Sequence, residues 1–387
     1  MKMRAITRWL LCLCPSLLLG TSVALTACQV VRPANDQDSS AVSMRQEAPA
    51  TRSPSEASGD ESPAPMDDAE HVNPSESIPL DNPRGVAIGQ AGEIYVSDSG
   101  DPSALYPGRV LRISPTGEIT PYVAPFSAAP AGVAGGTFIT GLSDVAVSGD
   151  ILYVLLGAGA FLQSPLYAEN HLIAIGPTGD ITNLFNARAF ESEHNPDGAE
   201  IDSNVASVVA DQDRVLWVTD AAGNWVARLV PSEAAGDPWA VSVVTTFPAV
   251  SGEDAVPTGV AVGPDGNAYV TLFRCQEPTR GKGGIARVKP DGTYEIVASG
   301  FSNPIDIAFD PGGQMYVLEF AVDYAPRTGR LIRIGDDGGQ AVALDGLTYP
   351  TSVAFDARGS AYITEMAAVS GGEAGTGKLL RFDGVGQ

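Results

Sequence analysis

The fold is decided by the stretch Pro304-Ile305-Asp306-Ile307-Ala308-Phe309-Asp310-Pro311-Gly312-Gly313-Gln314-Met315-Tyr316-Val317. Two short apolar segments, 304–309 and 315–317, flank a group of Asp, Pro and Gly residues that supplies turn geometry. Alternating β-branched and aromatic residues favour strands. The stretch therefore predicts two antiparallel strands joined by a tight turn.

The same pattern recurs six times. First strands are expected at 83–88, 142–147, 205–210, 257–262, 304–309 and 350–355. A third strand with a basic and apolar signature, such as Arg330-Leu331-Ile332-Arg333-Ile334, follows each second strand, and five copies add a fourth. The copies begin 46 to 63 residues apart, which is the period of a propeller blade. The sequence predicts an all-β, six-bladed β-propeller of four-stranded antiparallel blades.

The sixth copy lacks a fourth strand, because the sequence ends at Gln387 shortly after the third. The segment Ser77-Ile78-Pro79-Leu80-Asp81-Asn82-Pro83 resembles the ends of two later fourth strands, Gly300 to Pro304 and Gly346 to Pro350. An open edge needs cover. We therefore expect residues 75–80 to close the ring as the outer strand of the last blade.

Composition excludes two classes of partner. The 387 residues carry a formal net charge of −23 and only four lysines, Lys2, Lys282, Lys289 and Lys378. Neutralising phosphates requires clustered basic residues, so no nucleic-acid partner is expected. A basic patch for anionic lipids is missing for the same reason.

The N-terminus predicts export and a lipid anchor. Lys2, Arg4 and Arg8 precede the apolar run 9–19, which is the order of a secretory signal. Leu25-Thr26-Ala27-Cys28 resembles a bacterial lipoprotein box, with Cys28 as the lipidated first residue. Residues 1–27 are therefore the predicted signal peptide, residues 28–75 a disordered acidic tether rich in Ser, Pro and Ala, and residues 76–387 the propeller. The expected product is a monomer, extracytoplasmic and attached to the cell envelope through that lipid alone.

One face of the predicted ring carries the long connections, at 99–108, 124–141, 157–170, 186–204, 273–283, 321–329 and 367–377. Binding sites usually lie on loops held by a rigid scaffold, so a small molecule or a protein is expected to bind there. Two columns of residues point to this rim. The mouths of the first strands read Gly85, Asp144, Ser207, Gly259, Asp306 and Ser352, and the ends of the second strands read Asp98, Leu156, Asp220, Leu272, Glu319 and Glu365.

Six carboxylates near one confined channel mouth cannot all ionise without a counter-charge, so a hard cation such as calcium, arginine partners or raised carboxyl pKa values are expected there. Asp144 and Asp306 lie on opposite blades, so calcium between them is one hypothesis, with Asn224 as a further oxygen ligand. The alternative is that Asp98 and Asp220 cap their own loops, that Glu319 and Glu365 are merely solvated, and that spare amide donors of the inner strands bind the others. Only three histidines occur, His71, His171 and His194, so neither a histidine-based zinc site nor a Ser-His-Asp site is expected.

One loop carries a resemblance to a known family. Asn195-Pro196-Asp197-Gly198, Asp202-Ser203-Asn204 and Asp220-Ala221-Ala222-Gly223-Asn224 are similar to the middle of the ScyD/ScyE family of exported propellers with NHL-type repeats. The resemblance spans about Pro79 to Phe382, although Asn204-Val205-Ala206-Ser207 departs from that family's Asn-Pro and Gly. It implies an exported six-bladed propeller and no defined reaction.

Two functions remain open at this stage. A binding or scaffold module is favoured, because no acid, base and nucleophile set is evident. The alternative is a calcium-dependent lactonase or hydrolase similar to the SMP-30 group. Asp144, Asp220, Asn224, Asp306 and Glu319 would then supply the ligands.

Overall fold

The computed structural model describes residues 73–101, 108–126, 129–133, 136–157, 169–232, 239–275, 278–366, 369–370, 373–374 and 377–386. The predicted signal peptide, Cys28 and the tether up to residue 72 lie outside these described residues. Within them, no helix is long and apolar enough to cross a membrane.

Six four-stranded antiparallel sheets make up the fold, each a blade whose first strand is innermost. Blades one and two are β2 (Pro83–Ile88), β3 (Ile94–Asp98), β4 (Gly108–Ile113), β5 (Ile119–Phe126) and β8 (Leu142–Ser148), β9 (Ile151–Leu156), β10 (His171–Ile175), β11 (Ile181–Asn186). Blades three and four are β12 (Val205–Ala210), β13 (Leu216–Asp220), β14 (Trp225–Pro231), β15 (Trp239–Thr246) and β16 (Pro257–Val262), β17 (Ala268–Leu272), β18 (Gly283–Val288), β19 (Tyr294–Phe301). Blades five and six are β20 (Pro304–Phe309), β21 (Met315–Glu319), β22 (Gly329–Ile334), β23 (Gln340–Leu347) and β24 (Pro350–Phe355), β25 (Ala361–Glu365), β28 (Gly377–Phe382), β1 (Glu76–Leu80).

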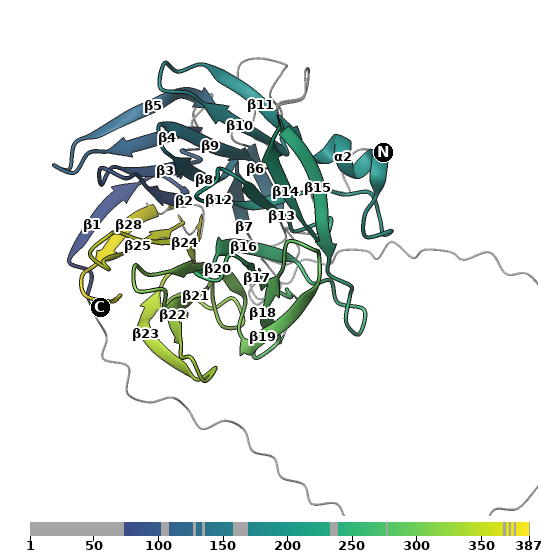
Figure 1. Cartoon of the computed structure of the whole chain (residues 1–387). Coiled ribbons are helices and arrows are strands. Elements are labelled where there is room, and N and C mark those ends of the chain that lie inside the picture. Colours follow the sequence, from purple (N-terminus) through teal and green to yellow (C-terminus); the bar gives the residue numbers. More distant parts are fainter. Residues whose placement is uncertain are drawn as a thin grey trace, which may run out of the picture. The chain divides into compact units, whose positions relative to one another are not determined.

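The six innermost strands form a closed ring (Figure 1). Each contacts the innermost strand of the next blade, and β24 of blade six contacts β2 of blade one. The predicted six-bladed β-propeller is therefore confirmed.

The N-terminal strand closes this ring as predicted. β1 pairs antiparallel with β28, from Glu76 opposite Arg381 to Leu80 opposite Gly377, and becomes the outer strand of blade six. Leu80 is buried in a cluster with Leu379 and Tyr362. Strands from both ends of the described chain therefore share one sheet.

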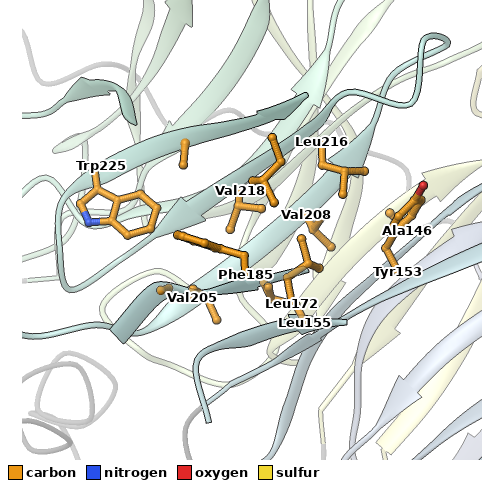
Figure 2. Packing of buried hydrophobic residues seen from close by; sticks show 13 residues of the cluster. Ala146, Tyr153, Leu155, Leu172, Phe185, Val205, Val208, Leu216, Val218 and Trp225 are labelled. Atoms are coloured by element: carbon orange, nitrogen blue, oxygen red, sulfur yellow. The ribbon is translucent and has the colours of Figure 1, made fainter. Parts of the chain in front are cut away.

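The apolar core consists of layers between neighbouring blades. Figure 2 shows the layer between blades two and three, where Phe185, Val208 and Trp225 pack together with Leu155 and Leu216. Each strand alternates its side chains between the two faces of its blade, so both faces must be apolar. This explains the near-continuous Val, Ile, Leu and Ala runs in the inner strands.

Three connections on the long-loop face contain secondary structure that the sequence pattern did not predict. β6 (Ala129–Val133) and β7 (Gly136–Thr140) form a hairpin between blades one and two, and β26 (Val369–Ser370) pairs with β27 (Glu373–Ala374) in blade six. Helix α2 (Ala187–His194) follows β11, and the Asn186 side chain caps its N-terminus. Short segments in Gly- and Ala-rich loops lack the periodicity that would reveal them.

Candidate functional site

The channel mouth on the long-loop face holds a cavity of about 110 Å³, here called the loop-face cavity. Every inner strand shifts its pairing register with its neighbour near the mouth, for example between Pro304 and Asp306 and between Pro350 and Ser352. The other four shifts have equivalent positions. A bulge re-aims side chains, so two consecutive residues per blade can contribute to the mouth.

Two columns of residues consequently line the loop-face cavity. The first column contributes four of its predicted members, Asp144, Ser207, Asp306 and Ser352. The other set of lining residues was not predicted from the sequence. It lies one residue before the first column in each blade: Arg84, Ser143, Ala206, Thr258, Ile305 and Thr351. The only signal available in the sequence was the polar or charged character of Arg84, Thr258 and Thr351 at strand starts.

The side chains of Asp144 and Asp306 join neighbouring blades by accepting hydrogen bonds from both. Asp144 accepts the N–H of Val145 at 2.8 Å and, across the blade boundary, the N–H of Val208 at 2.9 Å and the hydroxyl of Ser207 at 2.8 Å. Asp306 accepts the N–H of Ile307 and that of Val353, each at 2.9 Å. Inner-strand amides that face the channel have no strand partner there, and these carboxylates satisfy them.

The hydrogen bonds of Asp144 and Asp306 repeat with a period of three blades. The mouth column reads Gly, Asp, Ser in blades one to three and again in blades four to six. In both halves the glycine gives room to the aspartate of the next blade, because a Cβ on Gly259 would lie 2.5 Å from Asp306 Cα. The mouth of the channel therefore has approximate two-fold symmetry in its contacts.

Gly85→Ala is expected to lower the free energy of unfolding by about 1–3 kcal/mol, the usual cost of overpacking. A Cβ there would lie 2.1 Å from Asp144 Oδ1 and 2.7 Å from Asp144 Cα, and the backbone cannot give way. Gly176→Ala is the matched control, since its Cβ would meet only the Asp180 carbonyl oxygen at 3.9 Å. Urea titrations of both variants measure the difference, and equal stabilities would contradict the close contact.

Burial strongly perturbs the ionisation of this layer. Desolvation, followed by the nearby Asp306 charge, raises the pKa of Asp144 to about 7. Desolvation likewise raises the pKa of Asp306 to about 6, against the lowering effect of its amide hydrogen bonds. Burial lowers the pKa of Arg84 to about 10, so this residue remains cationic at neutral pH. The loop-face cavity thus combines the guanidinium groups of Arg84 and Arg188 with four carboxyl groups, those of Asp144, Glu169, Asp202 and Asp306. Burial raises the pKa of three of them, Asp144, Asp202 and Asp306.

The four carboxylates of the second predicted column do not line the loop-face cavity. Each accepts the N–H of a residue that leads into its own blade's inner strand, at 2.6–2.8 Å: Asp98 from Asn82, Asp220 from Asn204, Glu319 from Ser302 and Glu365 from Thr348. Three of them face a base on the third strand of the same blade. Arg109 lies 3.1 Å from Asp98, Arg330 lies 2.6 Å from Glu319, and Lys378 is opposite Glu365.

For Asp98 and Asp220 these contacts match the loop-capping alternative weighed from the sequence. Glu319 and Glu365, expected there to be solvated, are instead buried and accept backbone N–H groups in the same way. Asp220 has no base opposite it and instead accepts the Ser203 hydroxyl at 2.6 Å. Asn224 joins two loops, because its side chain donates to Asp197 at 3.2 Å and accepts the Val256 N–H at 3.2 Å. The predicted residues are therefore on the correct face, but only Asp144 and Asp306 share the loop-face cavity.

A further buried carboxyl group, which the sequence did not reveal, belongs to helix α2 itself. Glu191 is 0% exposed and accepts the Trp225 indole N–H at 2.8 Å. Burial raises its pKa to about 7, and the carboxylates of Asp220, Asp197 and Asp202 add to the shift. Nothing in the alternation of 187–194 distinguishes this glutamate from its exposed neighbours, because its burial depends on packing against blade three.

The described residues do not assemble a recognisable metal centre. Among them, no group of three or more His, Cys, Asp or Glu side chains is placed to hold a metal ion. Asp144 and Asp306 already accept several N–H and O–H donors, and structural calcium sites use six to eight oxygen ligands. The carboxylates of Asp144 and Asp306 therefore fit the role of hydrogen-bond acceptors between blades better than the role of calcium ligands.

The comparisons with known proteins support the fold. The sequence matches no protein-family model and no curated protein. A structural-genomics protein of unknown function from Bacteroides thetaiotaomicron is 14% identical over 80% of this chain and 72% of that one, with a TM-score of 0.52. The PQQ-bound aldose sugar dehydrogenase of Streptomyces coelicolor is 16% identical over 80% and 100%, with a TM-score of 0.50.

Virginiamycin B lyase from Staphylococcus aureus is 14% identical over 79% of this chain and 98% of that one, with a TM-score of 0.47. Membership of the ScyD/ScyE family stays a prediction. The chain is a six-bladed β-propeller module.

Proposed function

We propose that the protein is an extracytoplasmic binding module, attached to the envelope through Cys28, that takes a small polar molecule into the loop-face cavity. The observation that carries this proposal is that two guanidinium groups, of Arg84 and Arg188, and several carboxyl groups, Asp144 and Asp306 among them, line one small cavity. Oppositely charged, desolvated groups in a concave site orient a ligand by its own charges. Zwitterions such as free amino acids match this arrangement.

The contacts around the cavity favour binding over hydrolysis. The Ser207 hydroxyl donates to Asp144 and the Ser203 hydroxyl donates to Asp220. No histidine is among the residues that line the loop-face cavity, so neither serine has the imidazole base of a hydrolytic triad. A lactonase similar to the SMP-30 group would need the calcium ligands gathered at one point. The described carboxylates are instead separated, some accepting loop amides and others accepting amides of the inner strands.

A thermal-shift panel of the twenty amino acids, common monosaccharides and calcium chloride tests the proposal. At a hundredfold excess over its Kd, a ligand stabilises the native state by about 2.7 kcal/mol, which raises the Tm by several degrees. We expect a zwitterion to produce this shift. Ala206→Leu, which fills the cavity from a half-buried lining position, is expected to abolish it, whereas Ala199→Leu at an exposed loop position is the control.

Two results would overturn the proposal. One is a panel in which no organic compound shifts the Tm of the unmodified protein. The other is a shift by calcium alone that Asp144→Asn removes, which would restore the metal hypothesis.

A further inference from the structure

The opposite end of the channel holds a larger cavity of about 900 Å³, here called the turn-face funnel. It opens on the face that carries the tight turns, and all six inner strands line it. Asp144, Ser207, Asp306 and Ser352 line both this funnel and the loop-face cavity. The layer formed by these four residues is therefore the floor of the funnel and separates the two cavities.

The walls of the funnel are unpaired strand edges. The hairpin bonds from Gly89 N to Glu93 O and from Gly263 N to Asn267 O fix which residues pair within a blade. Because hydrogen-bonded and non-hydrogen-bonded pairs alternate in an antiparallel ladder, residues such as Val86 and Ile88 direct their N–H and C=O groups toward the channel. The same argument applies to the corresponding pairs in the other blades: 145 and 147, 208 and 210, 260 and 262, 307 and 309, 353 and 355.

Five of these twelve channel-facing N–H groups are accepted by side chains at the floor. The N–H groups of Val145, Val208, Ile307 and Val353 are accepted by the two aspartates. The N–H of Val86 is accepted by the Ser352 hydroxyl at 3.3 Å. The carbonyl oxygens of the same residues remain directed into the channel, so the funnel offers more acceptors than donors.

The charged residues around the funnel also favour a ligand with N–H donors, because most of them are acidic. Asp211, Asp213 and Asp310 stand at its rim, where the inner strands end in turns. Among the lining residues Arg228 alone is a basic side chain, and its guanidinium lies 5.6 Å from the centre of the Trp217 ring. Electrostatics and hydrogen bonding both favour a ligand that is cationic and rich in N–H donors.

We propose that the turn-face funnel binds a linear aliphatic polyamine along the propeller axis, with one ammonium at the floor and another at the rim. Floor and rim are four residues apart on one strand, from Asp306 to Asp310, or roughly 13 Å at about 3.3 Å per residue. An extended triamine spans about this length. Its methylene segments would lie against the half-buried Ile88, Val262 and Phe309.

Isothermal titration of the folded propeller with spermidine, in 150 mM salt, tests this proposal. We expect saturable binding of one spermidine per chain and much weaker binding of putrescine, which is too short to bridge floor and rim. A linear diol of the same length is not expected to bind. Ala206→Leu should leave spermidine binding unchanged, so failure of this proposal and of the proposed loop-face ligand are distinguishable.

Gln212→Lys provides the decisive variant, because Gln212 is exposed in the turn that lines the rim. The added cation is expected to weaken spermidine binding about tenfold. Asn183→Lys makes the same charge change at an exposed position on β11 and should alter the Kd less than twofold. Equal weakening by both variants would mean general attraction to an acidic surface and would overturn the proposal. So would undetectable binding, or full displacement of spermidine by equimolar calcium or magnesium.

Discussion

Deleting residues 29–80 is expected to lower the free energy of unfolding by several kcal/mol and to destabilise blade six first. The deletion removes β1, which forms five residue pairs with β28. It also removes the Ser75 N–H bond to the Arg381 carbonyl and the buried Leu80 side chain. Each net hydrogen bond is worth about 1 kcal/mol, and a buried leucine about 1.5–3 kcal/mol.

A deletion of residues 29–73 is the control, because it removes the tether and leaves β1 intact. We expect it to unfold like the full chain. Urea titrations followed by circular dichroism give the free energies, and hydrogen exchange reports which strands lose protection. If the longer deletion unfolds as cooperatively and at the same urea concentration as the shorter one, β1 does not close the ring.

The second large effect is a loss of stability as the pH rises. The folded state raises the pKa of Asp144 and Glu191 to about 7 and that of Asp202 and Asp306 to about 6, above their ordinary values of 3.8 and 4.5. At pH values between the ordinary and the raised pKa values, the folded state binds more protons than the unfolded state. The free energy of unfolding therefore falls with increasing pH. The stabilisation is fully present near pH 4, and it is lost as the pH rises through 6 to 7.

Each strongly shifted group is expected to contribute on the order of 2 kcal/mol to this loss, since one pKa unit corresponds to about 1.4 kcal/mol and water in the channel screens part of it. Thermal melts between pH 5 and pH 8 measure the slope. Asp144→Asn should reduce the difference between the two pH values. It should also lower the Tm at both, because an amide has one acceptor oxygen for the three donors that Asp144 now satisfies.

Asp150→Asn, at an exposed position in the turn after β8, is the matched control and should leave the slope unchanged. A Tm that climbs steadily from pH 5 to pH 8 would contradict the raised pKa values.

The sequence by itself determined the architecture of this protein. Six copies of a strand, turn and strand pattern, such as 304–317, depend only on local turn chemistry and on the alternation of side chains along a strand. The missing sixth outer strand and the likeness of 77–83 to later outer strands were enough to predict how the ring closes. Both kinds of signal repeat along the chain, so they can be detected without three-dimensional contacts.

Only the tertiary structure decided which residues share a site. The sequence placed six carboxylates at one mouth, but the register shifts in the inner strands bring Arg84 and its column into the loop-face cavity. Asp98, Asp220, Glu319 and Glu365 instead turn to the amides of their own loops. A carboxylate binds the nearest unsatisfied donor, and which donor is nearest depends on how separate blades meet around the axis.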